Sequence, residues 1–234
     1  MVAAARAPRL AEARVRNASK ELWLRAADLS APLTAVKNDP TPQSRLDTKA
    51  VGVLGFQLAG TSALALVGAR MSGQRYARSC DPSGTGIDCA WFARNGIDLH
   101  GINVALAERS NLDRRVHAAI AVDQELSDYF DPGSLMEISV PVQVISLGEP
   151  AANRSELAAS RLARAIPRAN YDTVANAIGC DAFNPCKLQG PAILRQEGDD
   201  EAICHDGQRP RAEVHALLAQ VTASFFRAHL QSGQ

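Results

Sequence analysis

The residues with the clearest chemical geometry surround Gln57, between an apolar run and a helix-forming run. Residues 50–54 are apolar and β-prone, Gly55 follows, and a helical sequence begins within three residues. Small residues at 55, 59 and 60 suit a sharp turn from strand into helix, as in a nucleophile elbow of pattern G-x-S-x-G. The central position here holds Gln57, whose amide has no nucleophilic lone pair that a histidine could activate. The sequence therefore predicts the scaffold of a nucleophile without the reactive atom.

Four apolar runs predict the strands that must position this turn. They cover residues 50–54, 117–122, 140–147 and 171–174. An uninterrupted apolar run is typical of a strand buried on both faces of a parallel sheet. Helical patterns alternate with these runs, over residues 155–165 and, after Pro210, over residues 211–230. We therefore predict an α/β fold whose mostly parallel sheet is flanked by helices.

The segment before the first strand has a different character. Residues 1–28 are rich in Ala, Arg, Glu and Leu, which predicts a helix, and the turn residues from Asn38 onward predict a loop. Residues 72–90 are rich in Ser, Gly and Asp, the composition of a surface insertion. We predict two units, in which residues 1–49 form a helical arm and linker and residues 50–234 form the α/β domain.

The composition excludes several classes of function. With 25 basic and 25 acidic residues the formal net charge is zero, which argues against nucleic-acid binding. No stretch approaches the roughly 20 apolar residues of a membrane span, and the N-terminus has no apolar signal segment. Gly52, Gly55 and Gly60 match neither a phosphate loop nor a dinucleotide motif. We expect a protein without a cofactor, a membrane or a nucleic-acid partner.

Five cysteines are compatible with two interpretations. Cys80 and Cys89 flank one polar loop, and Cys186 and Cys204 flank another, which suits disulfides in an oxidising compartment. Because the N-terminus lacks an export signal, we instead expect reduced thiols in the cytoplasm, although loss of a signal segment would explain the cysteines equally well. The spacing of Cys180, Cys186 and Cys204 is not that of a structural zinc site, so we predict no metal.

Several segments, in the same order, resemble one family. Residues 56–70, Phe-Gln-Leu-Ala-Gly-Thr-Ser-Ala-Leu-Ala-Leu-Val-Gly-Ala-Arg, resemble the F-S-L-G-G-x-x-A-L-x-L-x-G-A segment of dienelactone-hydrolase-like proteins. The likeness continues through residues 123–135, 140–148, 204–207 and 211–215. These proteins are α/β-hydrolases related to the platelet-activating-factor acetylhydrolases. The resemblance extends over about residues 20–230 and implies the fold of an ester or lactone hydrolase.

The resemblance implies a serine hydrolase triad, with nucleophile, acid and histidine in that chain order. Gln57 stands at the nucleophile position. The acid should follow a strand beyond the elbow, where Glu149 comes directly after the 140–148 segment. Asp123, at the tip of the preceding strand, is the other candidate acid, and an ordinary surface glutamate is the other interpretation of Glu149. Ser62, one turn into the elbow helix, is expected to pack rather than to react.

The histidine of such a triad should follow the last strand, within residues 175–183. The family pattern there is small-acidic-His-aromatic, and this chain has Ile178, Gly179 and Cys180 instead. His205 is the remaining candidate base, although a solvated loop histidine explains it better. Cys180 has no neighbouring histidine or basic group to lower its pKa, so we do not expect it to replace the nucleophile. Roles in packing or in solvent are expected for the other histidines, His100, His117, His215 and His229.

The resemblance also implies a sheet of about eight strands with the elbow strand usually fifth, whereas four are predicted here. We therefore expect the N-terminal strands to be missing, together with the loop that supplies one oxyanion donor. The strand beginning at Ala50 would then have an exposed edge, open to self-association. We hypothesise a degenerate, N-terminally shortened relative of ester hydrolases without triad catalysis. The alternatives are a weakly active carboxylic-ester hydrolase, or a pseudoenzyme that binds a small ester-like ligand or a partner.

Overall fold

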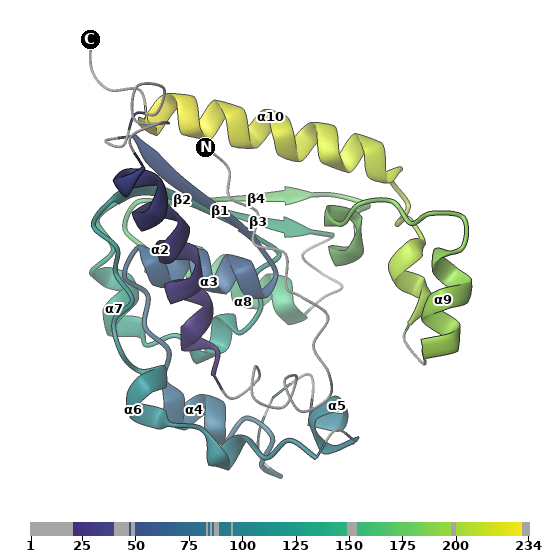
Figure 1. Ribbon diagram of the computed structural model, residues 1–234, viewed down its shortest axis with the longest axis horizontal. Coiled ribbons are helices and arrows are strands. Elements are labelled where there is room, and N and C mark those ends of the chain that lie inside the picture. Colours follow the sequence, from purple (N-terminus) through teal and green to yellow (C-terminus); the bar gives the residue numbers. More distant parts are fainter. Residues whose placement is uncertain are drawn as a thin grey trace.

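A four-stranded parallel sheet of order β1-β2-β3-β4 forms the centre of the computed structural model, which describes residues 21–39, 47, 50–82, 84, 86, 89–94, 96–148, 154–197 and 200–230. The strands are Val51–Phe56, Val116–Val122, Val142–Leu147 and Ala169–Val174. Helices lie on both faces of this sheet (Figure 1). The predicted α/β fold and its four strands are confirmed, with ends that differ by a few residues.

The two central strands owe their conformation to burial on both faces. β2 has no exposed surface from Ala118 to Val122, and every residue of β3 is buried. Small and β-branched apolar side chains suit such strands, because neither face meets water. Among the described residues β1 and β4 are the edges of the sheet. β1 is half-buried along most of its length, whereas β4 alternates between exposed and half-buried residues until Val174.

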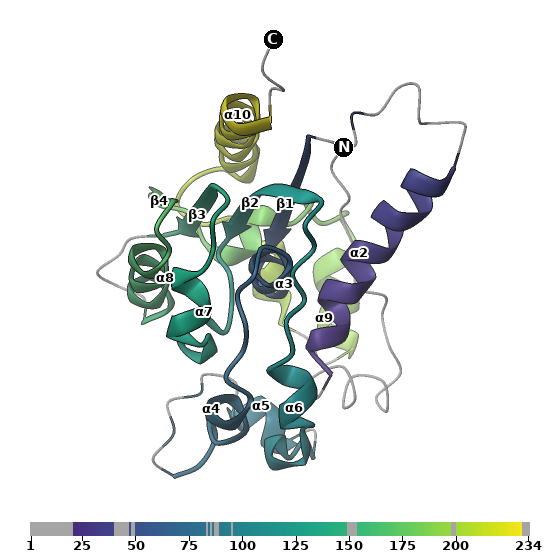
Figure 2. The ribbon, with the colours of Figure 1, turned by 90° about the vertical axis from the view of Figure 1, so that its left-hand side faces the viewer.

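Two helical layers cover the sheet. The helices α3 (Leu58–Leu66), α7 (Pro132–Met136) and α8 (Arg154–Ala165) lie on one face, with α2 (Trp23–Asn38) packed against α3 (Figure 2). The helix α10 (Arg211–Leu230) crosses the opposite face. Each layer encloses its own core, because the side chains of successive strand residues point to opposite faces of the sheet.

The last helix has the apolar face that its sequence predicted. Val214, Leu218 and Phe225 are buried, and Leu217 and Val221 are partly buried against the same core. The 3.6-residue period places these side chains on one stripe facing β1 and β2, which is the reason that the helix lies flat on the sheet. None of the described helices is long and apolar enough to cross a membrane.

The first described helix, α2, continues beyond the helix predicted over residues 1–28. It runs from Trp23 to Asn38, and the part of the prediction that covers residues 1–20 lies outside the described residues. Pro32 lies inside this helix, although proline removes a helical hydrogen bond and disfavours a helix interior. Contacts with a distant loop, rather than local propensity, therefore hold α2 in place.

A buried carboxylate anchors α2 to the loop before β2. Ser30 Oγ donates a hydrogen bond to Asp113 Oδ2 at 2.6 Å, and Arg115 donates to the same carboxylate through Nε at 2.8 Å and Nη2 at 2.5 Å. Arg115 Nη1 also donates to Thr34 Oγ1 at 2.9 Å. One turn toward the N-terminus, Ala26 enters the main core. These contacts explain why α2 continues past residue 28, where the sequence predicted the helix to end.

The segment between α3 and β2 forms a small packed unit. It contains α4 (Gly73–Ala77), α5 (Cys89–Arg94), the 3-10 helix η1 (Leu99–Gly101) and α6 (Val104–Ala107). Tyr76, Ile97, Leu99 and Ile102 are buried together there. The sequence predicted a surface insertion over residues 72–90. The buried Tyr76 and Ala77 correct this prediction, because they give the segment an apolar core of its own.

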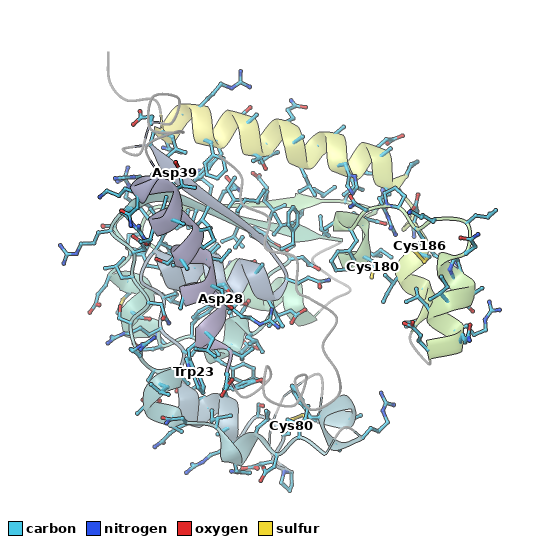
Figure 3. The ribbon with its side chains drawn as sticks, viewed as in Figure 1. Trp23, Asp28, Asp39, Cys80, Cys180 and Cys186 are labelled. Carbon is cyan, nitrogen blue, oxygen red and sulfur yellow. A yellow bond between two sulfur atoms is a disulfide. The ribbon has the colours of Figure 1, made fainter. Side chains whose placement is uncertain are left out.

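Two disulfides correct the expected thiol state. Cys80 bonds to Cys89 in the unit just described, and Cys186 bonds to Cys204 in the segment between β4 and α10. The two regions lie far apart in Figure 3. In each pair the two Cα atoms lie 5.3 Å apart, a separation that a disulfide spans without backbone movement. Cys180 is the free cysteine.

The β4–α10 segment, residues 175–210, is built from three short helices. These are the 3-10 helix η3 (Gly179–Ala182), α9 (Gly190–Glu197) and the 3-10 helix η4 (Glu201–Cys204). α9 packs against η4, and η3 packs against α10. This segment matters for function because it begins at the carboxyl edge of the sheet, where the candidate site lies.

Candidate functional site

Gln57 lies on the sharp turn that the sequence predicted, between the end of β1 and the start of α3. Its backbone has φ 49° and ψ −124°, a region that residues other than glycine rarely occupy. The turn is held by its own hydrogen bonds. Gln57 N donates to Val122 O of β2 at 2.9 Å, and Gln57 O accepts from Gly60 N at 2.8 Å and from Thr61 N at 3.2 Å.

Small residues around Gln57 are a steric requirement of this turn. A Cβ atom at position 55 would lie 2.0 Å from the carbonyl oxygen of Ala59, so only glycine fits there. A Cβ atom at position 60 would lie 2.9 Å from Cβ of Gln124, at the end of the neighbouring strand. The local sequence therefore folds strand against helix closely enough to leave Gln57 at the tip of the turn.

Each of the four strands is followed within two residues by a residue of positive φ. Gln57 follows β1 with φ 49°, Asp123 follows β2 with φ 47°, Gly148 follows β3 with φ 127°, and Asn176 follows β4 with φ 62°. Three of the four are not glycine, so the backbone carries strain at this edge of the sheet. Such strain gathers where surrounding structure fixes side chains for a purpose, which makes this edge the candidate functional site.

Asp123 is the acidic group of this edge. Its carboxylate is half-buried, and Oδ1 accepts one long hydrogen bond from Leu147 N at 3.5 Å. Burial raises the pKa of Asp123 because it disfavours the charged form, and the bond from Leu147 offsets only part of that effect. Among the described residues Asp123 has no cationic hydrogen-bond partner. A carboxyl group with a raised pKa can hold a proton, or accept one, nearer to neutral pH.

At Gly179 the β4–α10 segment comes close to the side chains of Gln57 and Asp123. A Cβ atom built on Gly179 would lie 2.5 Å from Asp123 Oδ2 and 3.4 Å from Gln57 Nε2. The amide of Gln57, the carboxylate of Asp123 and the backbone at Gly179 therefore meet at one point. Gly179 belongs to the stretch in which the family resemblance placed a histidine. The backbone at Gly179 lies at the position from which such a histidine side chain would extend.

None of the five histidines forms a hydrogen bond with Gln57 or Asp123 in the described part of the chain. His205 follows η4 with an exposed side chain. His100 pairs with Asp81 at 2.8 Å in the distant disulfide-linked unit. Ring nitrogens of His117 on β2 and His215 on α10 are buried without a partner, and His229 packs against Phe225.

The remaining candidates have no supporting geometry for nucleophilic chemistry. Ser62 is buried and its Oγ donates to Leu58 O at 3.0 Å, which agrees with the predicted packing role. Burial raises the pKa of the half-buried Cys180 thiol, and the more distant positive charge of Arg211 opposes this effect without reversing it. The predicted acid position Glu149 lies outside the described residues.

A buried ion cluster behind the site was missed by the sequence reasoning. Arg211, 2 % exposed, donates to Ile203 O at 3.1 Å and to His205 O at 2.9 Å, and its Nε lies 3.3 Å from Asp206 Oδ1. Asp181 has no exposed surface and accepts hydrogen bonds from the backbone of Ile178 and Gly207.

This cluster ties the start of α10 to the β4–α10 segment, since Arg211 Nε also lies 3.7 Å from Asp181 Oδ1. Because Asp181 follows Gly179 by two residues, the cluster fixes the backbone that contacts Gln57 and Asp123. The charged residues at positions 206 and 211, on either side of Pro210, were the available sequence signal, but their partner lies 30 residues upstream of Arg211.

The arrangement supplies hydrogen-bonding groups rather than a nucleophile. Gln57 provides an amide donor and an acceptor, and Asp123 provides a carboxyl group whose pKa is raised by burial. Among the described residues no group of three His, Cys, Asp or Glu side chains is placed to hold a metal ion. The site can therefore bind a polar ligand, but the described part of it lacks a hydroxyl–imidazole pair.

Comparison with known proteins gives a likeness of fold. No family model and no curated protein matches the chain. Among solved structures, a ferulic acid esterase from Streptomyces cinnamoneus, determined at 2.4 Å, is similar with a TM-score of 0.53 and 17 % sequence identity. The match covers 96 % of this chain and 51 % of the esterase, so this chain spans about half of the esterase's length. The likeness shows a hydrolase-like α/β fold.

Proposed function

We propose that this protein is a non-hydrolytic relative of ester hydrolases, whose site at the carboxyl edge of the sheet binds a small ester-like ligand without cleaving it. The observation that carries the proposal is the place of Gln57. It occupies the tip of a strained strand–helix turn and faces Asp123, while backbone at Gly179 fills the space beside both. The turn fixes the position of one side chain, and that side chain carries an amide rather than a nucleophile.

The chemistry of this arrangement favours binding over cleavage. Ester hydrolysis by covalent catalysis needs a nucleophile whose proton is taken by a neighbouring base. Gln57 has no such proton to lose, and none of the five histidines hydrogen-bonds to it in the described part of the chain. Loss of one triad member alone usually leaves only the weak catalysis of binding and oxyanion stabilisation. The amide of Gln57 can still donate a hydrogen bond to an ester oxygen without cleaving the ester.

Asp123 supports a second candidate function, a weak ester hydrolase of different mechanism. A half-buried carboxylate of raised pKa can act as a general base for water near neutral pH. In that case water, and not Gln57, would attack the ester. The two functions differ in which residue the activity depends on.

Four proteins separate these functions: the natural chain, Gln57→Ala, Gln57→Ser, and Gln57→Ser combined with Gly179→His. We expect the natural chain and Gln57→Ala to match the uncatalysed hydrolysis of p-nitrophenyl acetate and to resist labelling by a fluorophosphonate. Gln57→Ser should gain little, because it lacks a base. The double variant places an imidazole root beside Asp123, whose carboxylate must turn aside because a Cβ atom at position 179 would lie 2.5 Å from Oδ2. With that side chain moved, the double variant should gain about 10²-fold over Gln57→Ser, the usual size of general-base catalysis.

Binding is measured separately, by calorimetry with methyl ferulate, chosen because the structurally similar esterase is named for ferulic acid. The proposal expects binding by the natural chain that Gln57→Ala weakens, without any product. Ester turnover by the natural chain that Gln57→Ala abolishes, with fluorophosphonate labelling, would contradict the proposal. Turnover that instead survives Gln57→Ala and disappears in Asp123→Asn would establish the weak hydrolase.

The disulfides also bear on where the protein works. The expected reduced thiols do not agree with the two bridges, and disulfides persist in oxidising compartments and are rare in reducing ones. We propose an oxidising compartment. Titration of thiols in the denatured, unreduced protein should then find one reactive thiol, that of Cys180, whereas five thiols would support the cytoplasm.

A further inference from the structure

The outer part of the β4–α10 segment, residues 183–210, packs without an apolar core. None of its described residues is buried or belongs to an apolar cluster of the molecule. α9 packs against η4 and lies beyond the carboxyl ends of the strands in Figure 1. Burial of apolar surface, the usual force that holds elements together, is therefore weak here. A disulfide is the device that proteins use where a core is too small.

The Cys186–Cys204 bridge and the buried Arg211 join the same two stretches of this segment. Arg211 Nη1 donates a hydrogen bond to Asn184 O at 3.2 Å, two residues before Cys186. Its Nη2 donates to the carbonyl oxygens on either side of Cys204, at 3.1 Å and 2.9 Å. A Cβ atom on Gly190, where α9 begins, would lie 2.9 Å from Cys186 Cβ and 3.4 Å from Cys204 Sγ. The bridge therefore holds in place both α9 and the carbonyl groups that receive the guanidinium.

The contacts continue from Arg211 to the candidate site. Arg211 Nε lies 3.7 Å from Asp181 Oδ1, and Asp181 Oδ2 accepts a hydrogen bond from Ile178 N at 2.9 Å. Gly179 lies between these two residues in the chain, and its backbone is the part of the segment that comes close to both side chains of the site. The position of that backbone therefore depends on Asp181, on Arg211 and, through Arg211, on the bridge.

The other bridge, Cys80–Cys89, has a different setting. Its unit has a buried apolar core that includes Tyr76 and Leu99, and Cys80 is partly buried against that core. Hydrophobic burial can hold this unit together after its bridge is broken. Because the unit lies far from Cys180 and Cys186 in Figure 3, its bridge serves as a matched control for the one beside the site.

We propose that the Cys186–Cys204 bridge is a redox-sensitive clamp, which holds the β4–α10 segment against Gln57 and Asp123 when oxidised and releases it when a dithiol reduces the bridge. Cys186 is exposed, so a reductant can reach the sulfur atoms. The dithiol gives up two electrons and two protons, the S–S bond breaks, two cysteine thiols form and the reductant closes to its own disulfide. No described strand contains a half-cystine, so the sheet stays assembled.

The thiol of Cys180 reports the release, because Cys180 directly follows Gly179 and is half-buried in the closed segment. The natural chain, Cys186→Ser/Cys204→Ser and Cys80→Ser/Cys89→Ser each contain this one unpaired thiol. We expect iodoacetamide to react with it about tenfold faster or more in Cys186→Ser/Cys204→Ser, since local opening exposes the sulfur atom. The rates for the other two proteins should agree within about twofold. An unchanged rate, or an equal increase in both variants, overturns the proposal.

Amide hydrogen exchange in the same three proteins separates opening of the segment from unfolding. The Ile178 amide, bonded to Asp181, should exchange faster in Cys186→Ser/Cys204→Ser alone. The Ala119 amide donates to Pro141 O at 3.1 Å within the sheet and should stay protected in all three. Retained protection at Ile178 contradicts the clamp, and lost protection at Ala119 contradicts an independent sheet. Neither measurement needs a ligand, so the outcome does not depend on whether the site binds an ester.

Discussion

Two aspartates near the two ends of β2 occupy opposite electrostatic environments. Asp113, in the loop before the strand, accepts hydrogen bonds from the side chains of Arg115 and Ser30 and from the backbone of Arg115. Asp123, directly after the strand, accepts one long bond from a backbone N–H and has no cation beside it. Hydrogen bonds from Arg115 hold the pKa of Asp113 well below its usual range, whereas burial raises the pKa of Asp123.

The two carboxylates therefore have opposite effects on the stability of the fold when they are ionised. Asp113 is more stable as an anion in the native state than in the unfolded chain, so its ionisation stabilises the protein. Asp123 is less stable as an anion in the native state, so its ionisation destabilises the protein. A buried carboxyl group whose ionisation destabilises the protein is a candidate for binding or catalysis, since stability alone does not explain its presence. The predictions below test this contrast.

The largest expected effect belongs to Asp181, a second anchoring carboxylate. Replacing it with alanine leaves Arg211 with less neutralisation and leaves the backbone N–H groups of Ile178 and Gly207 without acceptors. We expect Asp181→Ala to cost about 3–5 kcal/mol of unfolding free energy, the usual cost of breaking a buried pair. Urea denaturation measures this value. Asp181→Asn retains an acceptor oxygen and should cost less, and equal costs for the two variants would mean that the hydrogen bonds contribute little.

Asp113→Asn should cost about 2 kcal/mol at neutral pH, because charge-assisted bonds from Arg115 are lost. The native pKa lies below the ordinary value of 3.8, so Asp113 contributes its stabilisation above that pH and loses it as the pH falls through its native pKa. The difference between the natural chain and the variant should therefore shrink in acid. Unfolding measured from neutral pH down to pH about 3 tests this trend.

Asp123→Asn should raise the free energy of unfolding, by less than Asp113→Asn lowers it. Asparagine tolerates the positive φ of this position and removes a charge that burial disfavours, so we expect a gain of no more than about 1 kcal/mol at neutral pH. Because the native pKa is raised, the gain should shrink as the pH falls toward 3.8. Thermal unfolding of the two proteins at several pH values gives the comparison. Destabilisation at neutral pH would place Asp123 among the anchors.

Thr34→Ala should have the smallest effect, on the order of 0.5 kcal/mol or less. Thr34 is exposed and accepts one hydrogen bond from Arg115, at the rim of the network whose centre is Asp113. Water can replace that bond more easily than the bonds at the centre, because the Asp113 side chain is only 9 % exposed. A double-mutant cycle with Asp113→Asn measures the coupling between rim and centre. A large coupling energy would show that the rim orders the network.

The fold was predictable from the sequence wherever burial alone decides the conformation. The strands β2 and β3 are buried on both faces and read as apolar runs, and α10 shows its single apolar face. The continuation of α2 past residue 28 was missed because its anchor, the bond from Ser30 to Asp113, spans 83 residues of sequence and leaves no local pattern. Pro32 further weakened the helical signal.

The candidate site was predictable only in part. Gln57 could be recognised because its turn demands small residues at fixed spacing, most strictly Gly55. The contacts between Gly179, Asp123 and Gln57 depend on three strands ending at one edge, which spacing along the chain does not reveal. The pairing of Arg211 with Asp181 likewise spans 30 residues of the chain, so no local pattern reveals it. Composition left the cysteine pairing open between thiols and disulfides.

The placement of the disulfides has a consequence for making the protein. Both bridges join half-cystines that are near neighbours in the chain, 9 and 18 residues apart, and neither is attached to a strand of the sheet. Each can form as soon as its own loop has been synthesised, before the sheet closes. A bacterial host with a reducing interior should therefore still yield the assembled sheet, with the bridges added afterwards by oxidation with air or with oxidised glutathione.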